Sequence, residues 1–124
     1  YGYEVILPHL MPKRNHRNHT VFLLEPLTYA LKEFTAVHPI CRLEYALIWF
    51  IYEYTEDTPI HCIRDYDNIE TKEVLDIINS FFLLDDGGAF CELHYSTRRG
   101  NRNGTRVIIS SDIGLVSCQK INGN

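Results

Sequence analysis

Three aspartates are the residues best suited to chemistry in this sequence. Asp65 and Asp67 stand two positions apart, and Asp86 follows further along in the run Asp85-Asp86-Gly87-Gly88. If the segment 63–67 is extended, Asp65 and Asp67 point the same way, because side chains alternate between the faces of a strand. Two carboxylates at so short a distance repel each other, and one of them holds its proton unless a cation such as Mg²⁺ lies between them. The sequence therefore indicates a metal site, with Asp86 as a third acidic group.

The same residues also have a structural interpretation. Aspartate and asparagine ahead of a helix are common capping residues, and Asp67 with Glu70 resembles a capping box. Asp85 is best interpreted as a turn residue. Lys72 has two interpretations of equal weight, which are a role in catalysis and an ion pair with Asp76, one helical turn away.

Basic residues are concentrated in two short segments. The formal net charge of −4 by itself argues against a nucleic-acid partner. However, eleven of the sixteen acids lie between Glu53 and Glu92, and six of the twelve basic residues fall in segments on either side of them. A solvated surface loop is the alternative for the first segment. The candidates for contact with a phosphate backbone are Lys13, Arg14, Arg17, Arg98, Arg99 and Arg102.

Composition indicates an ordinary soluble domain. The chain has 124 residues, of which 45% are hydrophobic and 23% charged, as expected for one globular domain. No apolar run is long enough for a membrane helix and no signal pattern opens the chain, so we expect a cytoplasmic protein without a membrane partner. The four cysteines lack zinc-site spacing and are expected to be reduced. The sequence opens with Tyr1 and not with Met, so we expect it to be a fragment of a longer protein.

The first half of the chain predicts two strands and a helix. The residues 3–7 are typical of a strand, and apolar spacing predicts a helix over 26–37 with Pro26 in its first turn. Within residues 43–54 the run 46–52 is apolar throughout, and its β-branched and aromatic content favours a buried strand. We expect Trp49 and its aromatic neighbours to lie in the core, and a turn over 55–59.

The second half predicts a further helix between extended segments. Residues 60–67 are expected to be extended and to pair with the preceding strand. A helix is expected from Asp67 or Asn68, with an apolar face of Val74, Leu75, Ile78, Phe81 and Phe82. The residues 85–88 indicate a turn.

Two more strands and a tail complete the pattern. Strands over 90–97 and 105–111 are predicted to form a hairpin whose loop, 98–104, carries three arginines. The tail 112–124 has little pattern. The fold class predicted is α+β, a small mixed β-sheet with two main helices. It forms a single domain over 1–113, followed by a partly disordered tail over 114–124.

These motifs resemble the signature of the RusA-type Holliday-junction resolvases. The resemblance rests on Arg64-Asp65-Tyr66-Asp67-Asn68, a helix with Lys72 and Asp76, and Asp85-Asp86. It extends to the first strand with its Leu-Pro end, the basic loop at 13–19 and the terminal strand pair. That family consists of small dimeric Mg²⁺-dependent endonucleases, often carried by prophages and other mobile elements.

The resemblance implies a function and a set of site residues. Asp65, Asp67 and Asp86 would hold Mg²⁺ or Mn²⁺, and Lys72 would assist catalysis as the fourth catalytic residue. The expected activity is cleavage of branched DNA in recombination, by a homodimer. The family places its lysine six residues after the first aspartate, and Lys72 lies seven after Asp65. One alternative is therefore a RusA-fold module of a mobile element that binds DNA or a protein without catalysis. A fortuitous match in an unrelated α+β fold is another.

Overall fold

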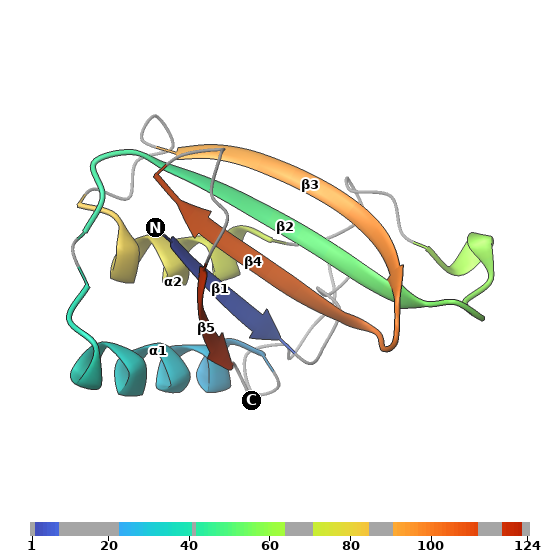
Figure 1. Cartoon of the computed structure of the whole chain (residues 1–124), viewed down its shortest axis with the longest axis horizontal. Coiled ribbons are helices and arrows are strands. Elements are labelled where there is room, and N and C mark those ends of the chain that lie inside the picture. The colour runs from blue at the N-terminus through green and yellow to red at the C-terminus, as the bar shows by residue number, and fades with distance from the viewer. Residues whose placement is uncertain are drawn as a thin grey trace.

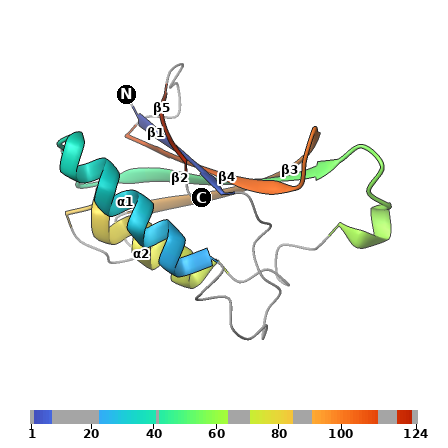
Figure 2. The same cartoon turned by 90° about the horizontal axis from the view of Figure 1, so that it is seen from below.

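The structure, a computed structural model, contains one mixed β-sheet with two helices packed on one of its faces (Figures 1 and 2). It describes residues 2–7, 23–40, 42–63, 71–84, 91–111 and 118–122. The α+β class predicted from the sequence is confirmed. No helix in these residues is long and apolar enough to span a membrane.

The sheet has five strands in the order β3-β2-β4-β1-β5. The inner pairs β2·β4 and β4·β1 are antiparallel, whereas each edge strand is parallel to its neighbour. The strands are β1 (Gly2–Leu7), β2 (Ala46–Thr55), β3 (Cys91–Gly100), β4 (Gly104–Ser110) and β5 (Cys118–Asn122).

The strands β1 and β2 and the helix α1 (Glu25–Val37) form where the sequence predicts them. Pro26 lies in the first turn of α1, where its missing N–H has no helical partner to lose. The predicted turn after β2 is also present, since Thr58 N–H donates to the Thr55 carbonyl at 3.0 Å. The basic loop at 13–19 and the turn over 85–88, both expected from the sequence, lie outside the described residues.

The helix α2 (Lys72–Phe82) begins later than predicted. Thr71 precedes it with φ −113° and ψ −9° and makes no side-chain cap, so the helix does not run back unbroken to Asp67 or Asn68. The predicted apolar face is correct, because Val74, Ile78 and Phe82 are buried and Leu75 and Phe81 pack against the core at its margin.

Both helices pack on the same strand residue. The Tyr3 ring of β1 lies 6.0 Å from Phe34 of α1 and 4.9 Å from Phe82 of α2, measured between ring centroids. Alternate residues of β2, from Ala46 to Tyr54, belong to the same core cluster. Burial of this one sheet face against two helices holds the two layers together.

The strand predicted over 60–67 is wrong at its beginning. Ile60–Cys62 form a 3₁₀ helix, in which Cys62 N–H donates to the Pro59 carbonyl at 2.9 Å. The positions on either side of β2 are already taken by β3 and β4, so this segment could not pair there. The remainder of the segment, 64–67, lies outside the described residues.

The predicted hairpin is also wrong, although its two strands exist. β2 lies between β3 and β4, and the connection 101–103 passes across the end of β2 instead of joining hydrogen-bonded neighbours (Figure 1). β2 is buried along most of both faces, which suits a central strand, whereas β3 is mostly exposed. Burial of the apolar strand therefore decides the order.

The tail contains a strand that the sequence pattern did not indicate. β5 (Cys118–Asn122) pairs with β1 in parallel, and Ile121 is buried in the core at 3% exposure. Five residues of the tail therefore form a strand that the sequence pattern does not predict. This strand forms by pairing with β1, from the opposite end of the chain, and a local sequence pattern does not reveal such a distant partner.

Candidate functional site

Of the predicted metal and catalytic residues, the described part of the structure contains only Lys72. Asp65, Asp67 and Asp86 lie outside it. In the sequence, two of them, Asp65 and Asp67, precede α2, and the third, Asp86, follows it. Among the described residues, no three acidic, histidine or cysteine side chains are close enough to hold a metal ion. The metal site therefore remains a prediction.

Lys72 is the first residue of α2, and its amine contacts an acid on the same helix. The Lys72 Nζ donates to Asp76 Oδ2 at 3.1 Å, and both side chains are well exposed. This is the ion pair that the sequence offered as the alternative to catalysis. An exposed pair of this kind contributes about 0.3–0.5 kcal/mol.

Arg99 is a residue of β3 whose side chain binds the turn after β2. Its Nη1 donates to the carbonyls of Thr55 at 2.8 Å and of Thr58 at 2.6 Å. Asp57 lies in the same turn, and its pKa is lowered chiefly by a hydrogen bond from the Thr55 side chain, with a smaller effect of the Arg99 charge. Arg99 is thus used for structure, which weakens its candidacy for phosphate contact.

Arg98 projects from the opposite face of β3 and covers an aromatic ring. Its guanidinium carbon lies 5.4 Å from the centroid of Trp49, a cation–π contact. The Trp49 Nε1–H donates to Ser96 Oγ at 2.7 Å. Trp49 is only partly buried and lies on the sheet face away from the helices, so its predicted core position is wrong. Phe50 and Tyr52, its aromatic neighbours, are in the core as predicted.

Arg102 is exposed in the connection between β3 and β4. The register of β1 and β4 pairs Leu7 with Thr105, so β1 ends beside this connection. The segment that carries Lys13, Arg14 and Arg17 follows β1 and lies outside the described residues. The chain thus leaves β1, toward its first basic segment, at the same end of the sheet where Arg98 and Arg102 lie.

A row of alternating charges crosses the open face of the sheet, the face without helices. Glu4 of β1 lies 3.8 Å from Lys120 of β5 and 3.8 Å from Arg106 of β4. The Arg106 Nε–H donates to Glu53 Oε1 of β2 at 2.5 Å. This hydrogen bond, more than the Glu53 and Glu4 charges, raises the pKa of Arg106, against the effect of burial. Four strands are therefore linked through their side chains.

The carboxylates of this row are well shielded from water. The side chains of Glu4 and Glu53 are 13% and 15% exposed. A Cβ at Gly100 would collide with the Glu53 Oε2 atom, so the end of β3 leaves room for this carboxylate. Sequence reasoning missed the row, although single charged residues within apolar strands were a detectable signal.

A smaller polar cluster lies at the beginning of β3. Glu92 accepts a hydrogen bond from the Tyr45 hydroxyl at 2.8 Å and lies 2.9 Å from His94 Nε2. The hydrogen bonds to His94 and then to Tyr45 lower the pKa of Glu92, while the bond to Glu92 raises the pKa of Tyr45. β3 consequently carries a carboxylate at its first half and arginines at its last.

The fold and this site define a class, a small two-layer α+β protein with one helix-covered sheet face and one open, charged face that ends in arginines. The chain belongs to a family of unknown function, DUF6100, which it matches over residues 3–113. The comparison with curated proteins gives no match.

Proposed function

We propose that this chain is a RusA-like, Mg²⁺-dependent endonuclease that acts on branched DNA such as Holliday junctions. The observation that carries the proposal is the place of α2, which connects β2 to β3 with an acid-bearing segment on either side. The resemblance implies this order of elements along the chain: strand, helix, strand, acidic segment, helix, acidic segment and two strands.

The chemistry of the acidic residues fits the metal. Asp65, Asp67 and Asp86 offer only carboxylate oxygens, the ligands that Mg²⁺ and Mn²⁺ prefer. A bound ion would lower the pKa of a water and neutralise charge at the scissile phosphate. Lys72, once released from Asp76, would stabilise negative charge that develops on the phosphate or the leaving oxygen.

The arginine-bearing end of the sheet would hold the DNA. Arg102 is exposed there and carries charge suited to phosphate groups. The proposal includes a homodimer, because a four-way junction has two strands to cut symmetrically, and a cytoplasmic location.

Substitution of one candidate ligand tests the endonuclease. Asp67→Asn should abolish Mg²⁺-dependent cleavage of a synthetic four-way junction, with the circular dichroism spectrum and DNA binding retained. Glu73→Gln, which changes an acid in the first turn of α2, is the matched control and should cleave normally. A wild-type protein that binds junctions and leaves them intact with Mg²⁺ or Mn²⁺ would contradict the proposal.

One observation favours a second function, a DNA-binding module without catalysis. The Lys72 amine forms an ion pair with Asp76 on its own helix, which is the structural role that the sequence offered as the alternative to catalysis. If Lys72 is catalytic, Lys72→Ala should lower the cleavage rate by about a hundredfold, and Asp76→Asn should not. Calorimetric titration with Mn²⁺ separates the two functions, since the module would bind junctions without binding the metal.

A further inference from the structure

The strand β3 is a long edge of the sheet. It has ten residues and, among the described strands, only β2 beside it. Most of its side chains are exposed. The strand lies at the outer margin of the sheet (Figure 1). An edge of this length presents a row of backbone N–H and C=O groups that can pair with another strand.

Charges on an edge strand ordinarily discourage such pairing, but here their order along β3 matters. Glu92 stands near the beginning of the strand, and Arg98 stands near its end on the same sheet face. Two strands that run antiparallel bring the beginning of one beside the end of the other. The edge is therefore complementary in charge to a second copy of itself.

Symmetry restricts the possible registers. A two-fold axis perpendicular to the sheet relates each face of β3 to the same face of the partner's β3. Residues directly opposite each other in an antiparallel pair project to the same face, so the axis must lie between a residue and its own copy. With the axis at Tyr95, Glu92 lies opposite Arg98 of the partner subunit, and the same pair recurs on the other side. An axis at His94 or at Ser96 would place Glu92 opposite serine or glycine.

The apolar side chains on the other face of β3 suit the same register. Leu93 and Tyr95 are 39% and 36% exposed, which is unusual for large apolar residues. The Tyr95 ring is stacked 5.8 Å from Phe50 and 6.3 Å from Tyr52, measured between centroids, so it is already held in place. Pairing about Tyr95 would bring the two Tyr95 rings together and cover Leu93 with Thr97 of the partner subunit.

We propose that two copies of this chain associate through antiparallel pairing of their β3 strands about a two-fold axis at Tyr95, with reciprocal Glu92–Arg98 ion pairs. The two sheets join into one, with the helices of both copies on the same face. The proposal names the surface of the homodimer. It can be tested without DNA or metal, so its failure would be distinct from failure of the endonuclease.

Charge exchange tests the ion pairs. Glu92→Arg and Arg98→Glu, made separately, place like charges opposite each other twice and should raise the dimer dissociation constant about tenfold in sedimentation equilibrium. The double variant should restore it. An equimolar mixture of the two single variants should form heterodimers, because each then supplies the sign that the other lacks, and this result does not depend on the loss of the Trp49 or Tyr45 contacts.

Cysteine cross-linking tests the register. Tyr95→Cys should form a disulfide-linked dimer under mild oxidation, because residues directly opposite each other in an antiparallel pair have Cα atoms within bonding range. Thr97→Cys alone should not, whereas mixed with Leu93→Cys it should, and the unsubstituted protein is the background. A wild-type protein that stays monomeric, a charge exchange without rescue, or equal cross-linking of the Tyr95→Cys and Thr97→Cys variants would overturn the proposal.

Discussion

Arg106 is the residue that connects the charges of the open sheet face. It lies between Glu53 and Glu4, whose carboxylates are both largely buried. Without Arg106, Glu53 would lose the cation that offsets its lost hydration, whereas Glu4 would keep the more exposed Lys120. The side chain of Arg106 is itself 35% exposed, so solvent weakens its attraction to both acids.

Loss of this cation should destabilise the fold. We expect Arg106→Met to lower the free energy of unfolding by about 2 kcal/mol, a value reduced for solvent screening, in urea titrations. Lys120→Met removes the exposed end of the same row and should cost less than about 1 kcal/mol. Equal losses in the two variants would contradict a central role for Arg106.

Asp57 makes stability depend on pH in the acid range. Its hydrogen bond from Thr55 lowers its pKa in the folded state below the ordinary 3.8. A lowered pKa stabilises the fold above the ordinary value, and this contribution is lost as the pH falls through the folded pKa. Asp57→Asn should therefore lose less stability than the wild type on acidification below about pH 4, measured as urea midpoints across a pH series. Thr55→Val should act in the same way, and unchanged pH dependence in both would refute this cause.

At the scale of elements, the connection from β3 to β4 is held where it crosses β2. The Thr55 N–H donates to Asn103 Oδ1 at 3.1 Å, and Arg99 binds the carbonyls of Thr55 and Thr58 from β3. Side-chain hydrogen bonds thus hold this connection in place, whereas in an ordinary hairpin backbone hydrogen bonds between the two strands do so. The arginines that the sequence places in one loop have different roles. Arg99 holds the turn after β2, whereas Arg102 is exposed.

The strand β5 should be needed for stability, although the sequence around it shows little pattern. Ile121 is its buried residue, and Ile121→Ala should cost about 2–4 kcal/mol in free energy of unfolding because it leaves a cavity beside β1. Lys120→Ala, the next residue on the opposite face, is the control and should stay within about 1 kcal/mol. Similar small effects of both would mean that β5 is only loosely attached.

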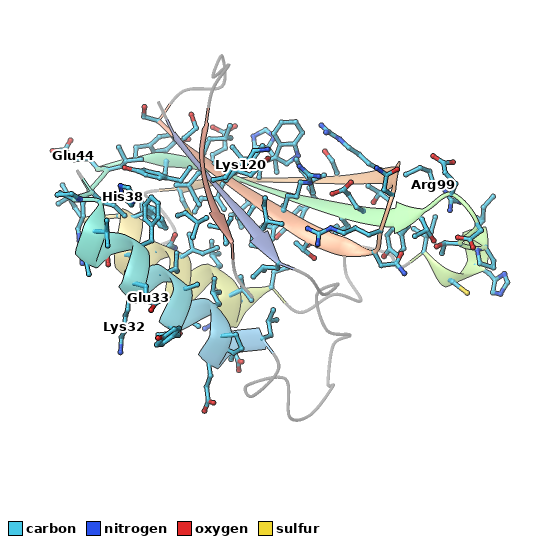
Figure 3. The ribbon with its side chains drawn as sticks, turned by 60° about the horizontal axis from the view of Figure 1, so that its bottom comes forward. Lys32, Glu33, His38, Glu44, Arg99 and Lys120 are labelled. Atoms are coloured by element: carbon cyan, nitrogen blue, oxygen red, sulfur yellow. The ribbon has the colours of Figure 1, made fainter. Side chains whose placement is uncertain are left out.

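At the scale of the whole molecule, Arg98, Arg99 and Arg102 lie at one end of the sheet, beside Glu53 and Asp57. Figure 3 shows Arg99 at that end and Lys32 far from it on α1. The proposed contact with DNA rests on these arginines and not on the net charge of −4. A group of arginines can contact phosphates even where the net charge of the protein is negative.

Binding of a DNA junction should depend on this end. Arg102→Ala should weaken binding of junctions of any sequence and reduce the salt dependence of log K by about one unit, because one phosphate contact is lost. Lys32→Ala, an equal change of charge on α1, should leave both unchanged. Fluorescence anisotropy at several salt concentrations measures both quantities, and equal effects of the two changes would show that only the total charge matters.

The parts of the fold that depend on local periodicity could be predicted from the sequence. α1, β1 and β2 lie where their patterns place them, and the buried face of α2 is the predicted one. The Lys72–Asp76 contact was also foreseeable as one alternative, because residues four apart on a helix meet by geometry alone.

The sequence by itself determined the class of fold, the apolar faces and the types of residue that chemistry could use. Only the tertiary structure decided that β2 separates β3 from β4, that β5 joins the sheet beside β1, and that Lys120, Glu4, Arg106 and Glu53 form one row. The physical reason is that strand pairing joins residues far apart in the chain, and competition for burial beside β2 selects the partners.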